Sequence, residues 1–75
     1  MDNKRFVEEV YNPYQEAWGL IKLLQHLKPD SSDSEWHKWN EQTLEFRKKY
    51  ADSEFGCALF RLLTDAGCAI GKMNE

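Results

Sequence analysis

Apolar side chains recur along this chain in alternating steps of three and four residues, and this spacing constrains the fold more than any other feature. The clearest run is Trp36, Trp39, Thr43, Phe46 and Tyr50. Because an α-helix turns by about 100° per residue, side chains at these steps lie on one face. No segment alternates with the period of a strand, and no Asn-Gly or Asp-Gly hairpin turn occurs. The spacing therefore predicts an all-α fold.

The first helix is expected over residues 4–28, with a kink near residues 12–13. Asn12 has the side chain of an N-cap, and Pro13 suits the first position of a helix. The residues before them would then form a short, kinked extension. Pro29 ends this helix, because a residue that precedes proline disfavours the helical conformation.

Two further helices are expected over residues 33–51 and 53–71. Ser32 and Glu35 fit a capping box at the start of the second helix. Asp52 or Ser53 can cap the third helix, and the residues after it are expected to fray. The apolar stripe of the third helix is expected to contain Phe55, Leu59, Leu62, Ala66, Ala69 or Ile70, and Met73.

Short linkers between amphipathic helices predict an up-down three-helix bundle that forms a single domain over residues 1–75. A chain of 75 residues buries a small core, and its three Trp, three Tyr and four Phe residues supply much of the available apolar area. The same rings could instead serve a partner, or a dimer could complete the core. Composition does not separate these alternatives.

Tyr11, Tyr14 and Trp18 are the residues that we expect to bind a partner. They share one face of the first helix, and Tyr and Trp are enriched where protein interfaces gain most of their energy. The alternative is that the three rings close the core of the bundle. The partner would be another protein or a second copy of the chain.

A short repeat holds both cysteines: Gly56-Cys57-Ala58-Leu59 recurs as Gly67-Cys68-Ala69-Ile70. On one helix the two thiols stand about 16 Å apart, too far for a disulfide or for a shared metal ion. We expect both to be small buried side chains, although Cys57 of one chain could meet Cys68 of another in an antiparallel dimer. The small residues would admit a close neighbour, with Trp36 and Trp39 as its natural source.

Charge and motifs argue against several functions. The net charge is −3 with acids and bases interspersed, which disfavours a phosphate-binding surface. One basic run, Arg47, Lys48 and Lys49, could contact nucleic acid, but it also completes the dipole at the end of a helix. No nucleotide fingerprint, nucleophile motif or metal-ligand pattern occurs, so we expect no catalysis, no cofactor and no metal.

The sequence therefore predicts a small, non-catalytic, protein-interaction or regulatory module of bacterial or phage origin. The alternative is a nucleic-acid-associated factor that uses the basic run. No apolar stretch is long enough to cross a membrane or to act as a secretory leader. With only two cysteines, a cytoplasmic location is expected.

Overall fold

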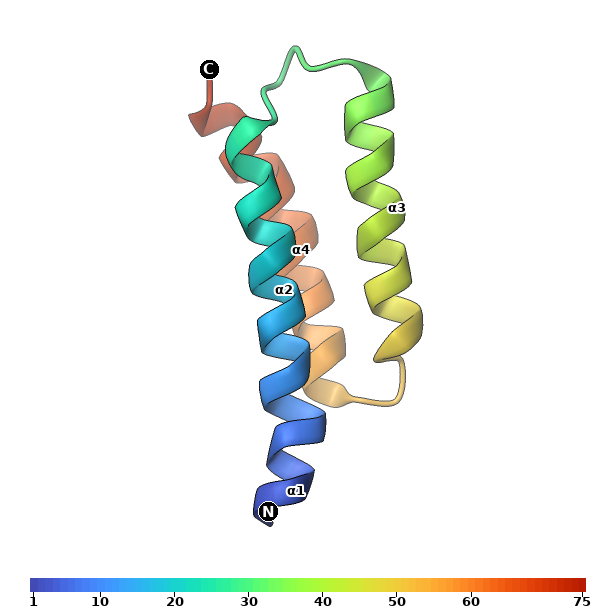
Figure 1. Ribbon diagram of the computed structural model, residues 1–75. Helices are drawn as coiled ribbons and strands as arrows, with labels where there is room; N and C mark the ends of the chain where they lie inside the picture. The colour runs from blue at the N-terminus through green and yellow to red at the C-terminus, as the bar shows by residue number, and fades with distance from the viewer.

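The computed structural model describes residues 1–75 as three helical rods that run up, down and up (Figure 1). The first rod contains α1 (Asn3–Phe6) and α2 (Asn12–Leu23), joined by a π-helical turn over Val7–Tyr11. The second rod is α3 (Asp33–Lys49), and the third is α4 (Glu54–Met73), which runs parallel to α2. No strand is present, and the molecule measures 44 × 20 × 15 Å. The expected all-α three-helix bundle is confirmed.

The first rod passes through Pro13 without a break, so Asn12 is not an N-cap. Asn12 has helical torsions, and its backbone N–H bonds to the Val7 carbonyl, five residues back. Pro13 has no N–H for the carbonyl of Glu9, and its ring would crowd that carbonyl in a regular α-helix. The π-helical turn accommodates the proline, and the Glu9 carbonyl accepts a 3.2 Å hydrogen bond from the Ser53 hydroxyl instead.

The upper end of the first rod tightens into a 3₁₀ turn over Leu24–His26. The backbone N–H of Leu24 bonds to the carbonyl of Ile21, and the indole N–H of Trp39 donates a 3.0 Å bond to the Leu20 carbonyl. Leu27 is extended. The rod therefore ends at His26, before the proline that was expected to stop it.

Asn74 ties the end of α4 to this 3₁₀ turn. Its side-chain Nδ2 donates two 2.8 Å hydrogen bonds, to the carbonyls of Leu24 and Leu27. Both carbonyls lie at a helix end, where helical N–H partners run out. The Leu24 carbonyl also accepts a 3.1 Å bond from the Leu27 N–H. The expectation that the chain frays after the third helix is wrong for Asn74, because a tertiary contact holds it.

The second rod follows the sequence pattern closely. Ser32 caps α3 by accepting a 3.2 Å bond from the Glu35 N–H. Trp39, Thr43 and Phe46 are buried, and the Thr43 hydroxyl donates a 2.8 Å bond to the carbonyl of Asn40. The apolar stripe of this helix therefore faces the other two rods.

The third rod is rotated relative to the expected stripe. Ser53 caps α4 by accepting a bond from the Gly56 N–H, as one of the two expected caps. The buried residues of α4 are Gly56, Leu59, Leu63, Gly67 and Gly71. Phe55, Leu62 and Met73, which were expected to be in the core, are exposed.

Two glycines on α4 explain this rotation, because each lies against a tryptophan ring of α3. A Cβ atom at Gly67 would come within 2.9 Å of Trp39 Cζ3, and one at Gly71 within 2.9 Å of Trp36 Cη2. The tryptophans thus pack over a surface without side chains, as expected from the sequence. Leu62 and Ala69 lie on the other side of the helix from Gly67. When the glycines face α3, these two side chains therefore point away from it.

Candidate functional site

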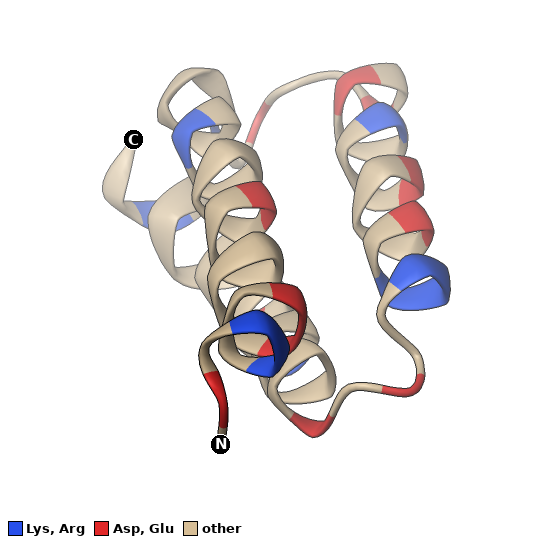
Figure 2. Ribbon diagram, turned by 60° about the horizontal axis from the view of Figure 1, so that its bottom comes forward, with Lys and Arg blue, Asp and Glu red and all other residues tan.

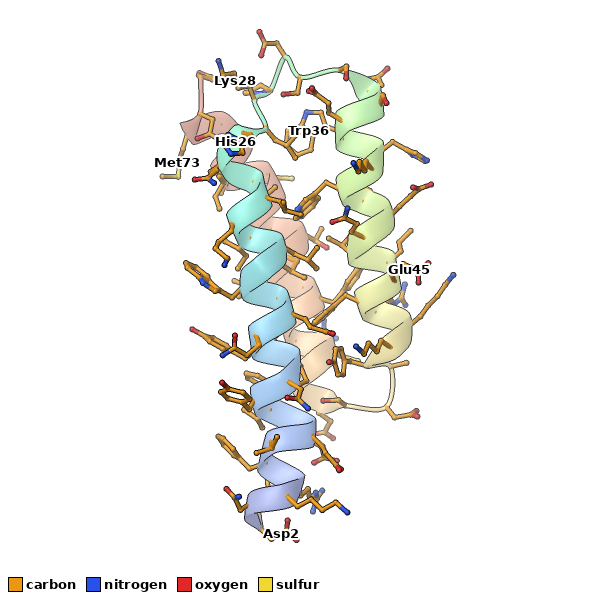
Figure 3. The ribbon with its side chains drawn as sticks, viewed as in Figure 1. Asp2, His26, Lys28, Trp36, Glu45 and Met73 are labelled. Carbon is orange, nitrogen blue, oxygen red and sulfur yellow. The ribbon has the colours of Figure 1, made fainter.

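The three aromatic side chains selected from the sequence lie exposed on the first rod. Tyr11 and Trp18 are each 50% exposed, and Tyr14 is 55% exposed. The structure therefore places the rings that sequence analysis selected at the surface of the bundle, away from its core. Figure 3 shows ring side chains projecting from the side of this rod that is turned away from α3.

The third rod presents a second row of exposed apolar side chains, which sequence analysis missed. The row follows helical steps of three and four residues and contains Phe55, Ala58, Leu62, Ala66, Ala69 and Met73. All are exposed except Ala66, which is half-buried. Met73 is labelled in Figure 3, where it points away from α3. The spacing was a signal that could have found this row, but the expected stripe mixed its members with core residues.

The two rows lie side by side on the face of the bundle opposite α3. Helix α3 packs against other positions of its neighbours: Leu20 and Glu16 on α2, and Gly67 and Gly71 on α4. Ser53 and Glu9, which are 44 residues apart, are hydrogen bonded across the parallel rods. On these two parallel rods, residues about 44 positions apart in the sequence therefore lie at the same height along the bundle. Trp18 and Leu62 are 44 positions apart, so they lie at a similar height. We call this surface, formed by the two rows, the outer face.

The basic run lies at the other side of the bundle and is divided among different contacts. The Arg47 guanidinium stacks over the Phe60 ring, 5.3 Å from its centroid, and Lys49 forms an ion pair with Glu16 of α2. Figure 2 shows acidic turns on α3 directly before its basic end. Of the three residues, Lys48 alone has no ion pair and no ring contact.

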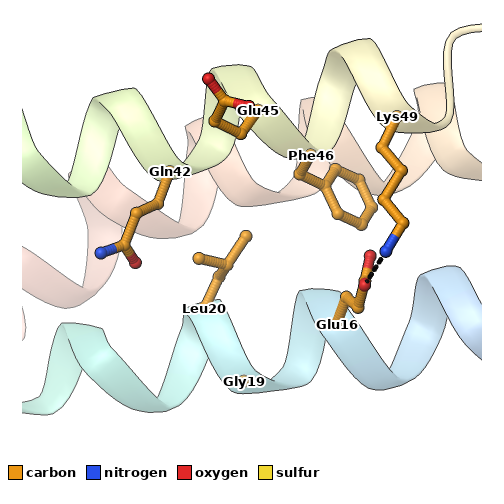
Figure 4. Close-up of a pocket in the computed structure, with 7 residues that line it drawn as sticks. All are labelled: Glu16, Gly19, Leu20, Gln42, Glu45, Phe46 and Lys49. Carbon is orange, nitrogen blue, oxygen red and sulfur yellow. Dashed lines mark hydrogen bonds and ion pairs between the residues drawn. The ribbon is translucent and has the colours of Figure 1, made fainter.

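The ion pair between Lys49 and Glu16 bridges a groove of about 360 Å³ between α2 and α3 (Figure 4). Partial burial raises the pKa of Glu16, but hydrogen bonds from Lys49 and Tyr50 and the Lys49 charge together lower it below its ordinary value. The hydrogen bond to Glu16 and the Glu16 charge raise the pKa of Lys49. The pair thus favours both charged forms and joins the first two rods.

We expect this pair to add a small acid-sensitive contribution to stability, because solvent screens an exposed ion pair. Since the pKa of Glu16 is lower in the folded chain, the contribution is present above the unfolded pKa and is lost as the pH falls through the folded pKa. Urea unfolding should show that Glu16→Gln costs stability at pH 7 but not at pH 2. Glu45→Gln in the same groove, where no ion pair forms, is the control, and an equal pH dependence in both variants would contradict the assignment.

Both cysteines are exposed, so the expectation that they are buried is wrong. The rotation that places Gly67 against Trp39 turns Cys68 toward solvent. No group of three or more His, Cys, Asp or Glu side chains is placed to hold a metal ion. A second groove, of about 480 Å³, runs between α3 and α4 and is lined by Trp36, Trp39 and the glycines beneath them.

The fold defines a small three-helix bundle with one apolar face that no helix of the chain covers. Comparison with protein families, with curated proteins and with solved structures finds no match. None of the helices is long and apolar enough to span a membrane. Function must therefore be inferred from the surface itself.

Proposed function

We propose that this chain is a non-catalytic protein-interaction module whose binding surface is the outer face. The observation that carries this proposal is the exposure of two adjacent apolar rows on parallel helices, including Tyr11, Tyr14 and Trp18 at about half of their area. A contiguous exposed apolar patch marks a site of protein interaction. Isolated exposed apolar side chains would have no such meaning.

The composition of the face suits protein binding. Tyr and Trp offer large apolar area together with one polar group, and they dominate interface energetics. Ala58, Ala66 and Ala69 lie beside the larger side chains and leave room for an opposing surface. Apolar area, rather than a cluster of charged groups, therefore defines what this face can bind.

The nucleic-acid alternative receives less support. A phosphate-binding surface needs several free cations on one face, whereas Lys49 is paired with Glu16 and Arg47 stacks on Phe60. The net charge of −3 also disfavours binding to the phosphate groups of a nucleic acid. A cytoplasmic location remains part of the proposal, because two exposed free thiols suit a reducing compartment.

A photo-reactive benzoylphenylalanine in place of Tyr14 tests this proposal. We expect it to give discrete cross-linked products in producing cells, identified by mass spectrometry as this chain or another protein. The same group in place of Leu44, which is 47% exposed on α3, is the matched control and should give none. Adding Trp18→Ala should weaken the products at least about tenfold, as for an interface anchor. Equal products from both positions, or none from either, would overturn the proposal.

A further inference from the structure

We propose that the occupant of the outer face is a second copy of this chain, paired antiparallel through α4 with the two-fold axis beside Leu62. The inference rests on the proposed function, because it takes the outer face as the binding surface. Three independent features support it: the symmetry of the apolar row, the charges along its edge and the area of the face.

Five of the six residues in the apolar row on α4 are spaced symmetrically about Leu62, and Met73 lies one step beyond them. Phe55, Ala58, Leu62, Ala66 and Ala69 are separated by steps of three, four, four and three residues. In an antiparallel pair, Phe55 lies opposite Ala69 of the second copy, and Ala58 lies opposite Ala66. Each large ring then meets a small residue, and the two Leu62 side chains meet at the axis, which allows close packing.

The charged residues along one edge of the row are placed symmetrically about Leu63, the residue after Leu62. The two members of each symmetric pair have opposite charges. Glu54, Arg61, Asp65 and Lys72 are all exposed along the edge of the row that α2 does not cover. The antiparallel arrangement places Glu54 opposite Lys72 of the second copy and Arg61 opposite Asp65. None of the four forms an ion pair within its own chain. The charges along this edge are therefore complementary to those of the same edge on a second copy that runs in the opposite direction.

The area of the face is close to what a stable dimer needs. An aromatic side chain covers roughly 150–250 Å², so Tyr11, Tyr14 and Trp18, each about half exposed, offer roughly 100 Å² apiece. Phe55, Leu62, the alanines and the charged edge bring the face near the roughly 800 Å² per partner of a standard interface. Trp18 lies near the height of Leu62 and therefore near the axis.

Sedimentation of the full chain over a range of concentrations tests self-association. We expect a dimer, and Leu62→Glu should raise its dissociation constant at least about 100-fold, because both copies place a carboxylate at the axis. Leu44→Glu on α3 makes the same change at a side chain of similar exposure, 47% against 51%, and should leave the dimer intact. A monomer at all concentrations, or a dimer that Leu62→Glu does not weaken, would overturn the inference.

A charge exchange tests the direction of the pair. Glu54→Lys places a second ammonium group opposite Lys72 of the other copy, twice per dimer, and we expect dimerisation to weaken about tenfold. The double variant Glu54→Lys with Lys72→Glu restores opposite charges and should recover the wild-type constant. Glu41→Lys on α3 changes the net charge equally and serves as the control. Failure of the double variant to recover dimerisation contradicts the antiparallel register.

The photo-cross-linking result separates the two proposals. Products that contain only another protein would leave the interaction module standing and overturn the second copy as its occupant. Absence of any product at Tyr14 would overturn both.

Discussion

Leu63→Ala is expected to lower the free energy of unfolding by about 2–5 kcal/mol, whereas Leu62→Ala lowers it by less than about 0.5 kcal/mol. Leu63 is 0% exposed at the centre of the core, and Leu62, the residue before it, is 51% exposed. Truncating the buried leucine loses its transfer free energy and leaves a cavity, while the exposed leucine has few contacts to lose. Urea unfolding at low protein concentration measures the difference.

The size of this effect matters because the bundle is small. A 75-residue domain has a total stability of about 4–11 kcal/mol, so Leu63→Ala could leave the chain largely unfolded. Leu63→Met keeps the volume and should cost less than about 1.5 kcal/mol, which gives a folded reference. Similar losses for Leu63→Ala and Leu62→Ala would show that α4 is turned differently from the structure.

Gly67→Leu is expected to destabilise the bundle by about 1–3 kcal/mol through overpacking. A Cβ atom at this position would already lie 2.9 Å from Trp39 Cζ3, and the ring is held by its 3.0 Å bond to the Leu20 carbonyl. The better helix propensity of leucine offsets up to about 1 kcal/mol of the clash. Because Trp39 must move, its fluorescence should shift toward that of an exposed indole.

Ala69→Leu is the matched control for Gly67→Leu. Ala69 belongs to the same Gly-Cys-Ala repeat but is exposed, so the added atoms meet no side chain of the same chain. The unfolding free energy of a monomer should change by less than about 0.5 kcal/mol. A large loss for Ala69→Leu, or none for Gly67→Leu, would show that Ala69, and not Gly67, packs against α3.

The second helix was well predicted because its boundaries and its buried face are both local properties. Ser32 caps the helix through a bond to a residue three positions later. The apolar run from Trp36 to Tyr50 has polar residues on nearly all other sides, which favours one orientation. Nothing outside the segment was needed to decide which face packs.

The start and cap of the third helix were predicted correctly, but the helix runs two residues beyond the predicted end, to Met73, and its orientation was wrong. Its apolar residues cover more than half of its circumference, so both Leu62 and Leu63 were candidates for the core. Gly67 and Gly71 pack against the tryptophans of α3, and this contact selects Leu63. The pairing of glycine with tryptophan was foreseen, but its consequence for Cys57 and Cys68 was not.

One part of the candidate site could be predicted from the sequence, and the other part could be seen only in the structure. Tyr11, Tyr14 and Trp18 were selected from their residue types and shared face, and their exposure is a property that only packing defines. The α4 half of the outer face was missed, because its residues were assigned to the core. The juxtaposition of the two rows requires knowing that α2 and α4 lie parallel and adjacent.

The sequence by itself determined that this chain is helical, where its second and third helices begin, and which rings on its first helix are candidates for a partner. These are consequences of spacing, capping and side-chain type within a few residues. The tertiary structure decided how α4 is turned, how Pro13 is accommodated and which apolar row faces solvent. The reason is that each depends on a contact between distant segments: Trp39 over Gly67, and Ser53 at the Glu9 carbonyl.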